Sequence, residues 1–156
     1  YVIDLLPVGK PVLRITRNVE PVPVRAAEQE DLMRVTQQML DYWGGQQTGT
    51  LEVAAVKPAI NGITFDAEGR LLVSVATPSE RYDAPPQRMR DGKVLEQAGW
   101  RSPLHYDVFE PDGRYIGQFA VPYGLRIKFV RGDEVWAVVR DDMDVEYLKK
   151  YRIMWQ

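Results

Sequence analysis

The sequence predicts an all-β chain of short antiparallel strands with one inserted α-helix at about 26–43. Short runs of apolar and β-branched residues alternate with turn residues along most of the chain, which is typical of strands joined by tight connections. One turn pattern occurs twice, at 65–71 and at 109–115. The helix is predicted from one segment in which apolar residues recur every three or four positions.

The composition is that of a folded domain. The 156 residues are 45% hydrophobic and 27% charged, with a formal net charge of −2, which differs from the composition of disordered chains. The chain has no excess of basic residues, so its charge does not indicate a nucleic-acid partner. The absence of cysteine excludes disulfides, thiolate metal sites and cysteine nucleophiles within this chain. No apolar run approaches the roughly 18–20 residues of a membrane span, and no signal peptide is visible in this chain.

About nine segments have the composition of strands. They are 1–6, 12–17, 63–66, 71–76, 104–109, 115–121, 125–130, 134–140 and 146–153, and 51–56 is a further candidate. The proline- and glycine-containing segment 7–11 is expected to be the turn between the first two strands. Since the chain opens in a strand and lacks an initiator Met, we expect it to be a piece of a longer polypeptide.

Two long segments, 18–61 and 77–103, interrupt the strands. The first contains the helix, and Gly44 and Gly45 are expected to end it. We expect one apolar stripe to be its buried face: Leu32, Val35, Met39 and Trp43. The second segment is polar and contains several prolines. Trp43 and Trp100 lie in these segments, so each is a candidate either for core packing or for the floor of a pocket.

The repeated turn has the pattern aromatic, acid, any residue, acid, Gly, Arg, apolar. The acid at its start can accept backbone N–H bonds, and the glycine supplies a positive φ without a Cβ clash. A shorter connection of the same kind lies at 131–133. Tight hairpins of this kind between short strands are typical of sheets built as repeated meanders.

These motifs resemble those of a known family. The stretch YDVFEPDGRYIG at 106–117 resembles the outer hairpin of a blade in bacterial six-bladed β-propellers of the NHL-like and TolB-like kind, and GITFDAEGRLLV at 62–73 resembles an inner hairpin. The ending at 130–153 is similar to the last blade of such proteins. The resemblance implies a bacterial binding scaffold outside the cytoplasm, because the proteins that it resembles are often exported.

A propeller blade is a four-stranded antiparallel meander, and the strands can be assigned to blades in order. Residues 1–17 would end one blade, and 18–61 would be a helical insertion. Residues 62–121 would form a complete blade, and 122–156 a last blade without its outer strand. The chain 1–156 is therefore expected to be a single partial β-propeller whose partners are the remaining blades of the same polypeptide.

The meander also predicts where a ligand binds. Because consecutive strands are antiparallel, the tight turns fall at one face and the long segments at the other, and binding residues concentrate on long loops of a rigid scaffold. The candidate ligand-binding residues on that face are Arg81, Tyr82, Asp83, Tyr123, Arg140 and Asp141. Further charged residues expected there are Arg88, Arg90, Asp142 and Asp144.

No catalytic motif is present, and we expect no metal or cofactor. The chain lacks G-x-S-x-G, H-E-x-x-H, P-loop and G-x-G-x-x-G patterns, so no catalytic residue is assigned. The carboxylates at 141–144 suit a hard cation, but they lack the spacing and glycine of a calcium loop. His105 is the only histidine and is expected to be structural.

Three alternatives remain open from the sequence. The first is a β-propeller scaffold that binds a small molecule, a peptide or a protein through its long-loop face. The second is a metal-dependent propeller hydrolase or lactonase, with ligands such as Asp66 or Asp141 and others in missing blades. The third is a free-standing β-sandwich with an inserted helix.

Overall fold

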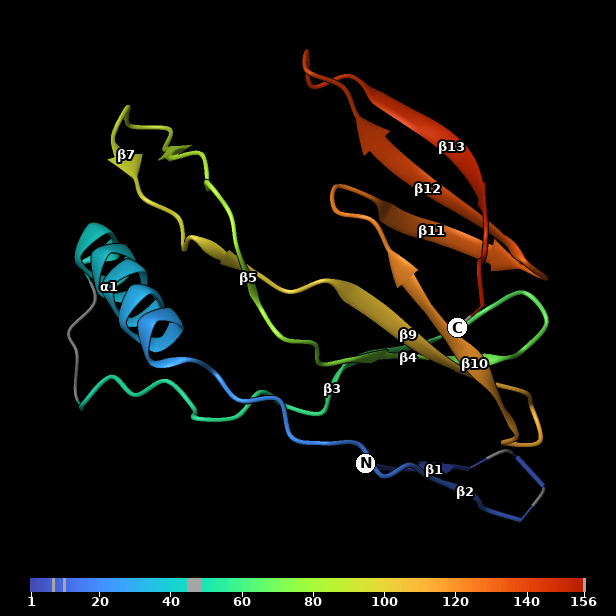
Figure 1. The fold of residues 1–156 in the computed structure, drawn as a ribbon. Coiled ribbons are helices and arrows are strands. Elements are labelled where there is room, and N and C mark those ends of the chain that lie inside the picture. The colour runs from blue at the N-terminus through green and yellow to red at the C-terminus, as the bar shows by residue number, and fades with distance from the viewer. Residues whose placement is uncertain (7, 10, 45–48, 156) are drawn as a thin grey trace. The chain divides into compact units, whose positions relative to one another are not determined.

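The computed structural model describes residues 1–6, 8–9, 11–44 and 49–155. Within them lie one helix and thirteen strands, and every strand pairing is antiparallel. The chain is therefore mostly β with a single helix, as the sequence predicts (Figure 1). No helix in this part of the chain is long and apolar enough to cross a bilayer.

The chain divides into two compact units. Unit 1 comprises Tyr1–Glu20, Pro58–Thr77 and Pro103–Gln156, and unit 2 comprises Pro21–Lys57 and Pro78–Ser102. Unit 2 therefore consists of the two long segments, of which the second had been assigned to the blade at 62–121.

Unit 1 contains three sheets. Its strands are β1 (Val2–Leu5), β2 (Leu13–Thr16), β3 (Ile60–Phe65), β4 (Leu71–Val75), β9 (Leu104–Phe109), β10 (Tyr115–Val121), β11 (Arg126–Arg131), β12 (Glu134–Arg140) and β13 (Glu146–Arg152). β1 pairs with β2, the order β10-β9-β4-β3 makes a four-stranded meander, and β11-β12-β13 makes a three-stranded one. The predicted bounds of β9, β10 and β12 are confirmed.

The candidate strand at 51–56 is wrong. Its only pairing in the described chain is an isolated bridge between Pro23 and Val56, because an apolar run forms a strand only where a partner strand runs beside it. The turn at 7–11 is only partly described: Pro7 and Lys10 lie outside the described residues, and Leu5 pairs with Leu13 across it.

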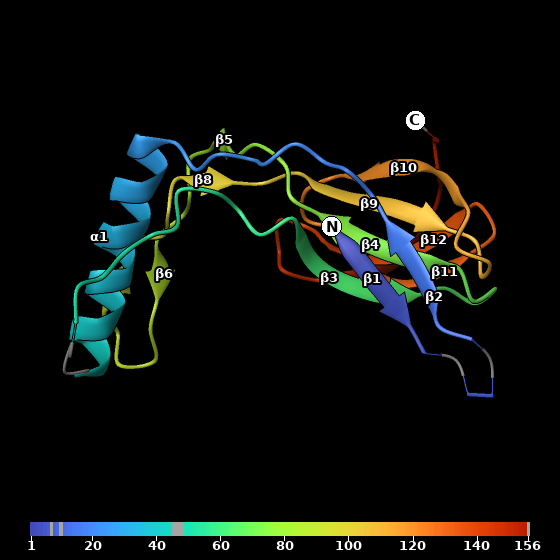
Figure 2. The same cartoon turned by 90° about the horizontal axis from the view of Figure 1, so that it is seen from below.

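The four-stranded sheet is buried on both faces, because β4 is buried at every residue. On one face Leu72 and Val108 pack toward Val130 and Val135 of the three-stranded sheet. On the other face the core comprises Leu71, Val73, Val75 and Phe109 with Ile3 and Ile15 of β1 and β2. The three sheets therefore stack face to face (Figure 2).

The two repeated turns share their backbone hydrogen bonds, but the backbone N–H of the arginine donates to Asp66 in the first turn and to Asp112 in the second. In the first, the Asp66 carboxylate accepts bonds from the backbone N–H of Glu68 at 3.0 Å and of Arg70 at 2.8 Å. In the second, the backbone N–H of Glu110 donates to the Arg114 carbonyl at 2.8 Å, which matches the Asp66–Arg70 backbone bond of 3.0 Å. The glycines have φ of 79° and 87° at positions 69 and 113, which confirms the need for glycine in the pattern.

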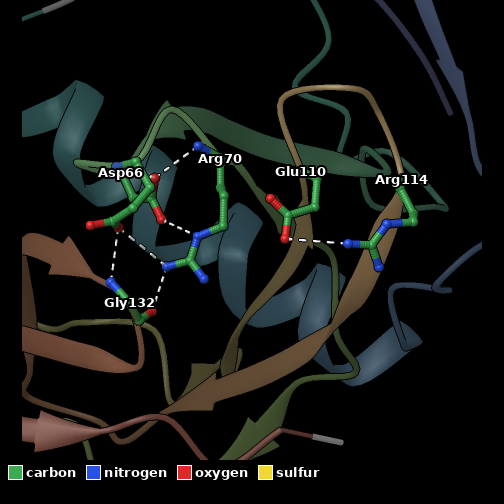
Figure 3. A network of polar contacts seen from close by, with 6 residues as sticks. Asp66, Arg70, Glu110, Arg114 and Gly132 are labelled. Atoms are coloured by element: carbon green, nitrogen blue, oxygen red, sulfur yellow. Dashed lines mark hydrogen bonds and ion pairs between the residues drawn. The ribbon is translucent and has the colours of Figure 1, made fainter.

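The tight turns of two neighbouring sheets touch each other. Arg70 bonds both Asp66 of its own turn and the carbonyl oxygen of Gly132 between β11 and β12 (Figure 3). The Gly132 N–H donates to the Glu68 carboxylate at 2.8 Å, and the Ala67 N–H donates to the Val130 carbonyl at 3.1 Å. These turns therefore lie at one end of the stack, as predicted.

The insertions leave from the opposite end of the four-stranded sheet. There Val75 pairs with both Ile60 and His105. Beyond these pairs, the Ala76 N–H donates to the Ala59 carbonyl at 3.1 Å, and the Thr77 hydroxyl donates to the Pro103 carbonyl at 2.5 Å. Both segments of unit 2 are thus attached at the end away from the Asp66 and Glu110 turns.

Unit 2 contains the helix and two short hairpins. α1 spans Ala26–Trp43, as predicted, and Gly44 ends it with a φ of 66°; Gly45 lies outside the described residues. β5 (Glu80–Arg81) pairs with β8 (Trp100–Arg101), and β6 (Gln87–Arg88) pairs with β7 (Val94–Leu95). These four two-residue strands were not predicted.

The predicted buried stripe of α1 is wrong at its end. Leu32, Val35 and Met39 are half-buried, but Trp43 is 70% exposed. Helical spacing shows which residues share a face, but it does not show how far the covering segment extends along that face. The most buried residue of the helix is instead an acid, Glu28.

Leu72→Ala is expected to lower the free energy of unfolding by about 2–5 kcal/mol, because it empties the core between two sheets. Leu6→Ala is the matched control: Leu6 is 76% exposed, so we expect a change within about 0.5 kcal/mol. Denaturant unfolding measures both values, and equal losses would contradict the stacked arrangement.

Candidate functional site

Unit 2 contains a polar cavity of ≈ 430 Å³, a volume within the range of small-molecule sites. Its wall comes from α1, from β5 and the segment that follows it, and from the segment that precedes β8. The lining residues are Asp31, Arg34, Arg81, Tyr82, Asp83, Ala84, Pro86, Glu96, Gln97 and Gly99. The predicted residues 81–83 therefore lie side by side on the wall of one cavity.

Part of the wall is a closed network of charges. The Arg34 guanidinium donates to Asp31 at 2.6 Å and also bonds the Glu96 carboxylate. The other Asp31 oxygen accepts the N–H of Gly99 at 2.7 Å. The bond from Arg34 holds the pKa of Asp31 below its usual range, and the bond from Gly99 adds to this effect. Asp31 and Glu96 are thus both bonded to the single guanidinium of Arg34.

Arg81 is differently placed. It pairs with Trp100 across the β5–β8 ladder, and its guanidinium lies 4.9 Å from the centre of the Trp100 ring. Arg25 lies 5.8 Å from the same ring. The charge of Arg81 also helps to lower the pKa of Asp31, so Arg81 adds to the charge network of the wall while the ring orients its guanidinium.

Tyr82 and Asp83 continue the same segment. The Tyr82 backbone N–H donates to the Gly99 carbonyl at 3.1 Å, and the Arg101 guanidinium lies 5.1 Å from the Tyr82 ring. Asp83 is exposed and makes no hydrogen bond or ion pair with the part of the chain that the structure describes. The wall therefore carries two positive and three negative side chains, and Asp83 is an exposed carboxylate among them.

The predicted residues Arg140 and Asp141 belong to unit 1 and stabilise a turn. Arg140 bonds Asp144 and Glu146, each at 2.7 Å. Asp141 accepts bonds from the N–H of Val145 at 3.0 Å and of Met143 at 2.9 Å. The bond from Val145 is the main reason that the pKa of Asp141 is lowered.

Three further residues that the sequence predicts as candidates do not line the cavity. Tyr123 is 39% exposed between β10 and β11. Arg88 and Arg90 are exposed around the β6–β7 hairpin and do not line the cavity. Among the described residues, no group of three or more acidic or histidine side chains is placed to hold a metal ion.

A second polar cluster in unit 2 joins the helix to both long segments. Lys57 Nζ lies 2.6 Å from Ser79 Oγ and 2.7 Å from Ser102 Oγ, and Ser79 Oγ donates to Glu28 at 2.5 Å. A serine beside a lysine can be a nucleophile only if the lysine is neutral. Here Lys57 Nζ forms an ion pair with Glu28 Oε1, which lies 3.6 Å away. Ser79 is also only 5% exposed, so a substrate would not reach it. The cluster therefore acts as an anchor that holds the helix to the two long segments.

A third cluster lies in unit 1 around Asp107, which is completely buried. Tyr1 Oη donates to it at 2.7 Å, Gln118 Nε2 donates at 2.9 Å, and Arg17 Nε forms an ion pair at 2.8 Å. Burial and the bond to Asp107 raise the pKa of Tyr1, which keeps its hydroxyl as a donor. His105 Nδ1 lies 3.1 Å from Gln118 Oε1, which fits the structural role expected for it.

Comparison with known proteins adds no identification. No family model, curated protein or solved structure matches this chain.

Sequence reasoning missed most of the cavity wall. Asp31 and Arg34 are three residues apart on a helix, a spacing that favours an ion pair, so the sequence contains a signal for that contact. Glu96 and Gly99 carry no such signal, because they meet the helix only after unit 2 has folded. Trp100, a candidate for a pocket floor, lies under Arg81.

Lys57→Met is expected to lower the free energy of unfolding by about 3–5 kcal/mol, because it leaves the buried Glu28 carboxylate without its cation. The Glu28 side chain is 6% exposed and that of Lys57 is 12% exposed. The double variant Glu28→Gln/Lys57→Met should lose less than the sum of the single changes. Denaturant unfolding of all three variants measures this coupling, and additive losses would show that the pair does not act as an anchor.

Proposed function

We propose that this chain forms blades of a β-propeller that binds a small molecule or peptide through the unit built from its two long insertions. The observation that carries the binding function is the cavity in unit 2, whose wall contains Arg81, oriented by the Trp100 ring, and the exposed carboxylate of Asp83. Natural binding sites commonly combine a preformed hollow with a few placed polar groups. A bacterial, extracytoplasmic origin remains part of this proposal and rests on the resemblance of the blade motifs.

The sheets of unit 1 support the propeller. Its strands form meanders in chain order, β3-β4-β9-β10 and then β11-β12-β13, and their faces pack on one another as blades do. A β-sandwich consists of two packed sheets, whereas here the middle sheet is covered on both faces. The stack therefore favours blades over a free-standing sandwich.

The outer face of the three-stranded sheet supports further blades. The register places Phe129 opposite Trp136, and Val138 opposite Leu148, on the face that lies away from the core. Phe129 is 40% exposed and Leu148 is 60% exposed. Apolar side chains that gather on one sheet face are typical of an interface. In the proposed propeller, remaining blades of the same polypeptide cover this face.

No observation favours the metal-dependent hydrolase over this proposal. Asp66 is bound to Arg70 and to two backbone N–H groups of its turn. Asp141 has a similar role between β12 and β13. Both carboxylates that the sequence offered as metal ligands therefore stabilise turns.

Leu148→Cys tests the covered face in the intact protein, because this chain has no cysteine of its own. We expect slow labelling by a maleimide, because a further blade would cover the side chain. Met143→Cys is the exposed control, since Met143 is 79% exposed in the β12–β13 turn. Equal labelling rates would contradict the propeller. Protection that disappears on dilution would also contradict it, since a second copy would then cover the face.

Ala84→Trp tests the cavity as a binding site, because a large ring at position 84 of the wall should fill it. We expect compounds that bind the wild-type chain in a ligand-observed NMR screen of a small-molecule library to lose binding in this variant. Ala54→Trp is the matched control, because Ala54 is exposed and outside the cavity. Both variants should unfold like the wild type. If the Ala84→Trp variant keeps every ligand, or if the wild type binds none, the proposed function is wrong.

A further inference from the structure

We infer that unit 1 contains a second binding site, which takes a small uncharged apolar molecule of about the size of one six-membered ring. The site is a hollow of ≈ 190 Å³ between β10 and the three-stranded sheet. This inference goes beyond the proposed function, because it concerns a different unit and a different class of ligand.

The floor of the hollow belongs to the hydrophobic core of unit 1. The lining residues that are buried all belong to the core between the four-stranded and three-stranded sheets: Phe119, Val121, Val135, Ala137 and Ile153. None of these side chains has a polar atom. The hollow is therefore an opening into the core, whereas the cavity of unit 2 has a charged wall.

The rim of the hollow is exposed, so a molecule from the solvent can reach the floor. The rim consists of the half-buried Leu125 and the exposed residues Ala120, Pro122, Tyr151, Arg152 and Met154. Arg152 is the one charged residue in this lining, and its Nε lies 3.2 Å from the Asp133 carboxylate. The rim therefore adds little net charge to an apolar floor.

The segment that follows β13 bounds the hollow on one side. The Ile153 N–H donates to the Asp133 carbonyl at 2.7 Å, which fixes the start of this segment. The segment then returns to β10, where the centre of the Trp155 ring lies 6.1 Å from that of the Phe119 ring (Figure 1). The chain itself therefore occupies the side from which a further strand would approach, and the remaining space has the size of a small molecule.

An apolar ligand is favoured because it completes the packing of the core. Protein interiors are normally close-packed, and floor atoms that face an empty space lack dispersion contacts on that side. A ligand that fills the hollow supplies these contacts and removes apolar surface from water. Apolar cavities of about 150 Å³ can bind benzene, so a hollow of ≈ 190 Å³ admits one ring with a small substituent.

The same floor disfavours charged and strongly polar molecules. A charged group loses its hydration when it enters the hollow, and the side chains of the floor offer it no hydrogen bond in return. This desolvation cost is large for an ion. The hollow should therefore select an uncharged molecule over a charged one of the same shape.

NMR and thermal unfolding of the intact protein test the inference with three probes that share one ring: toluene, benzoate and benzylammonium. We expect toluene near saturation to raise the unfolding midpoint by at least about 2 °C, because it binds only the folded state. Intermolecular NOEs should join toluene to the methyl groups of Val135 and Ala137. The two charged probes should bind at least about tenfold more weakly, because their charge must leave water.

Two variants should weaken toluene binding by at least about tenfold. Ala137→Leu fills the hollow from its floor, and Met154→Trp covers its mouth from a position that is 78% exposed. Met143→Trp is the matched control, since Met143 is 79% exposed and outside the hollow. Ala84→Trp should also leave toluene binding unchanged, because it alters unit 2. Unfolding without ligand shows whether each variant folds, and Met154→Trp decides the test if Ala137→Leu does not.

Three results would overturn the inference. If toluene does not bind, or binds without NOEs to Val135 and Ala137, the hollow is not its site, as when another segment of the intact polypeptide fills it. If a charged probe binds as tightly as toluene, the selection of apolar molecules is wrong. If Met154→Trp and a folded Ala137→Leu bind toluene like the wild type, the ligand lies elsewhere. None of these results bears on the unit 2 cavity, which the library screen and Ala84→Trp test separately.

Discussion

The register of the sheet stack depends on the buried carboxylate of Asp107. β4 is apolar enough to fit either core, because Leu72 packs on one side and Leu71 and Val73 pack on the other. Hydrophobicity alone therefore does not fix how β9 lies against it. A slip of one residue would turn every β9 side chain to the opposite face. Asp107 would then leave the Tyr1, Arg17 and Gln118 side chains for a purely apolar core, which carries a large energetic cost.

The parts of the fold that the sequence predicts are those set by local chemistry. The turn at Asp66 and its repeat at Glu110 are recognisable because acid, glycine and spacing all act within a few residues. α1 has the predicted bounds for the same reason, since its period and Gly44 are local signals. The two-residue strands β5 to β8 are too short to show any periodicity, so they appear only when unit 2 folds. Trp43 was assigned to the wrong surroundings because its exposure depends on a segment elsewhere in the chain.

In the candidate site too, some residues could be predicted from local sequence and others depend on tertiary contacts. Residues 81–83 were predicted from their place in a long loop, an argument that needs only the strand order. Their neighbours Asp31 and Arg34 reach them through contacts with Glu96 and Gly99, which are more than sixty residues away along the chain. Most of the cavity wall thus depends on tertiary pairing. Unit 2 also has few buried apolar side chains, Leu95 among them, so its ion pairs determine much of its shape.

The hydrogen bonds at the base of the insertions have an evolutionary consequence. The Ala59–Ala76 and Thr77–Pro103 bonds close the sheet before either segment of unit 2 begins. Changes in the length or sequence of those segments therefore leave the pairing of β3, β4 and β9 intact. Selection can therefore change unit 2 while these strand pairings stay the same. A related chain can thus differ in unit 2 without differing in the architecture of the sheet.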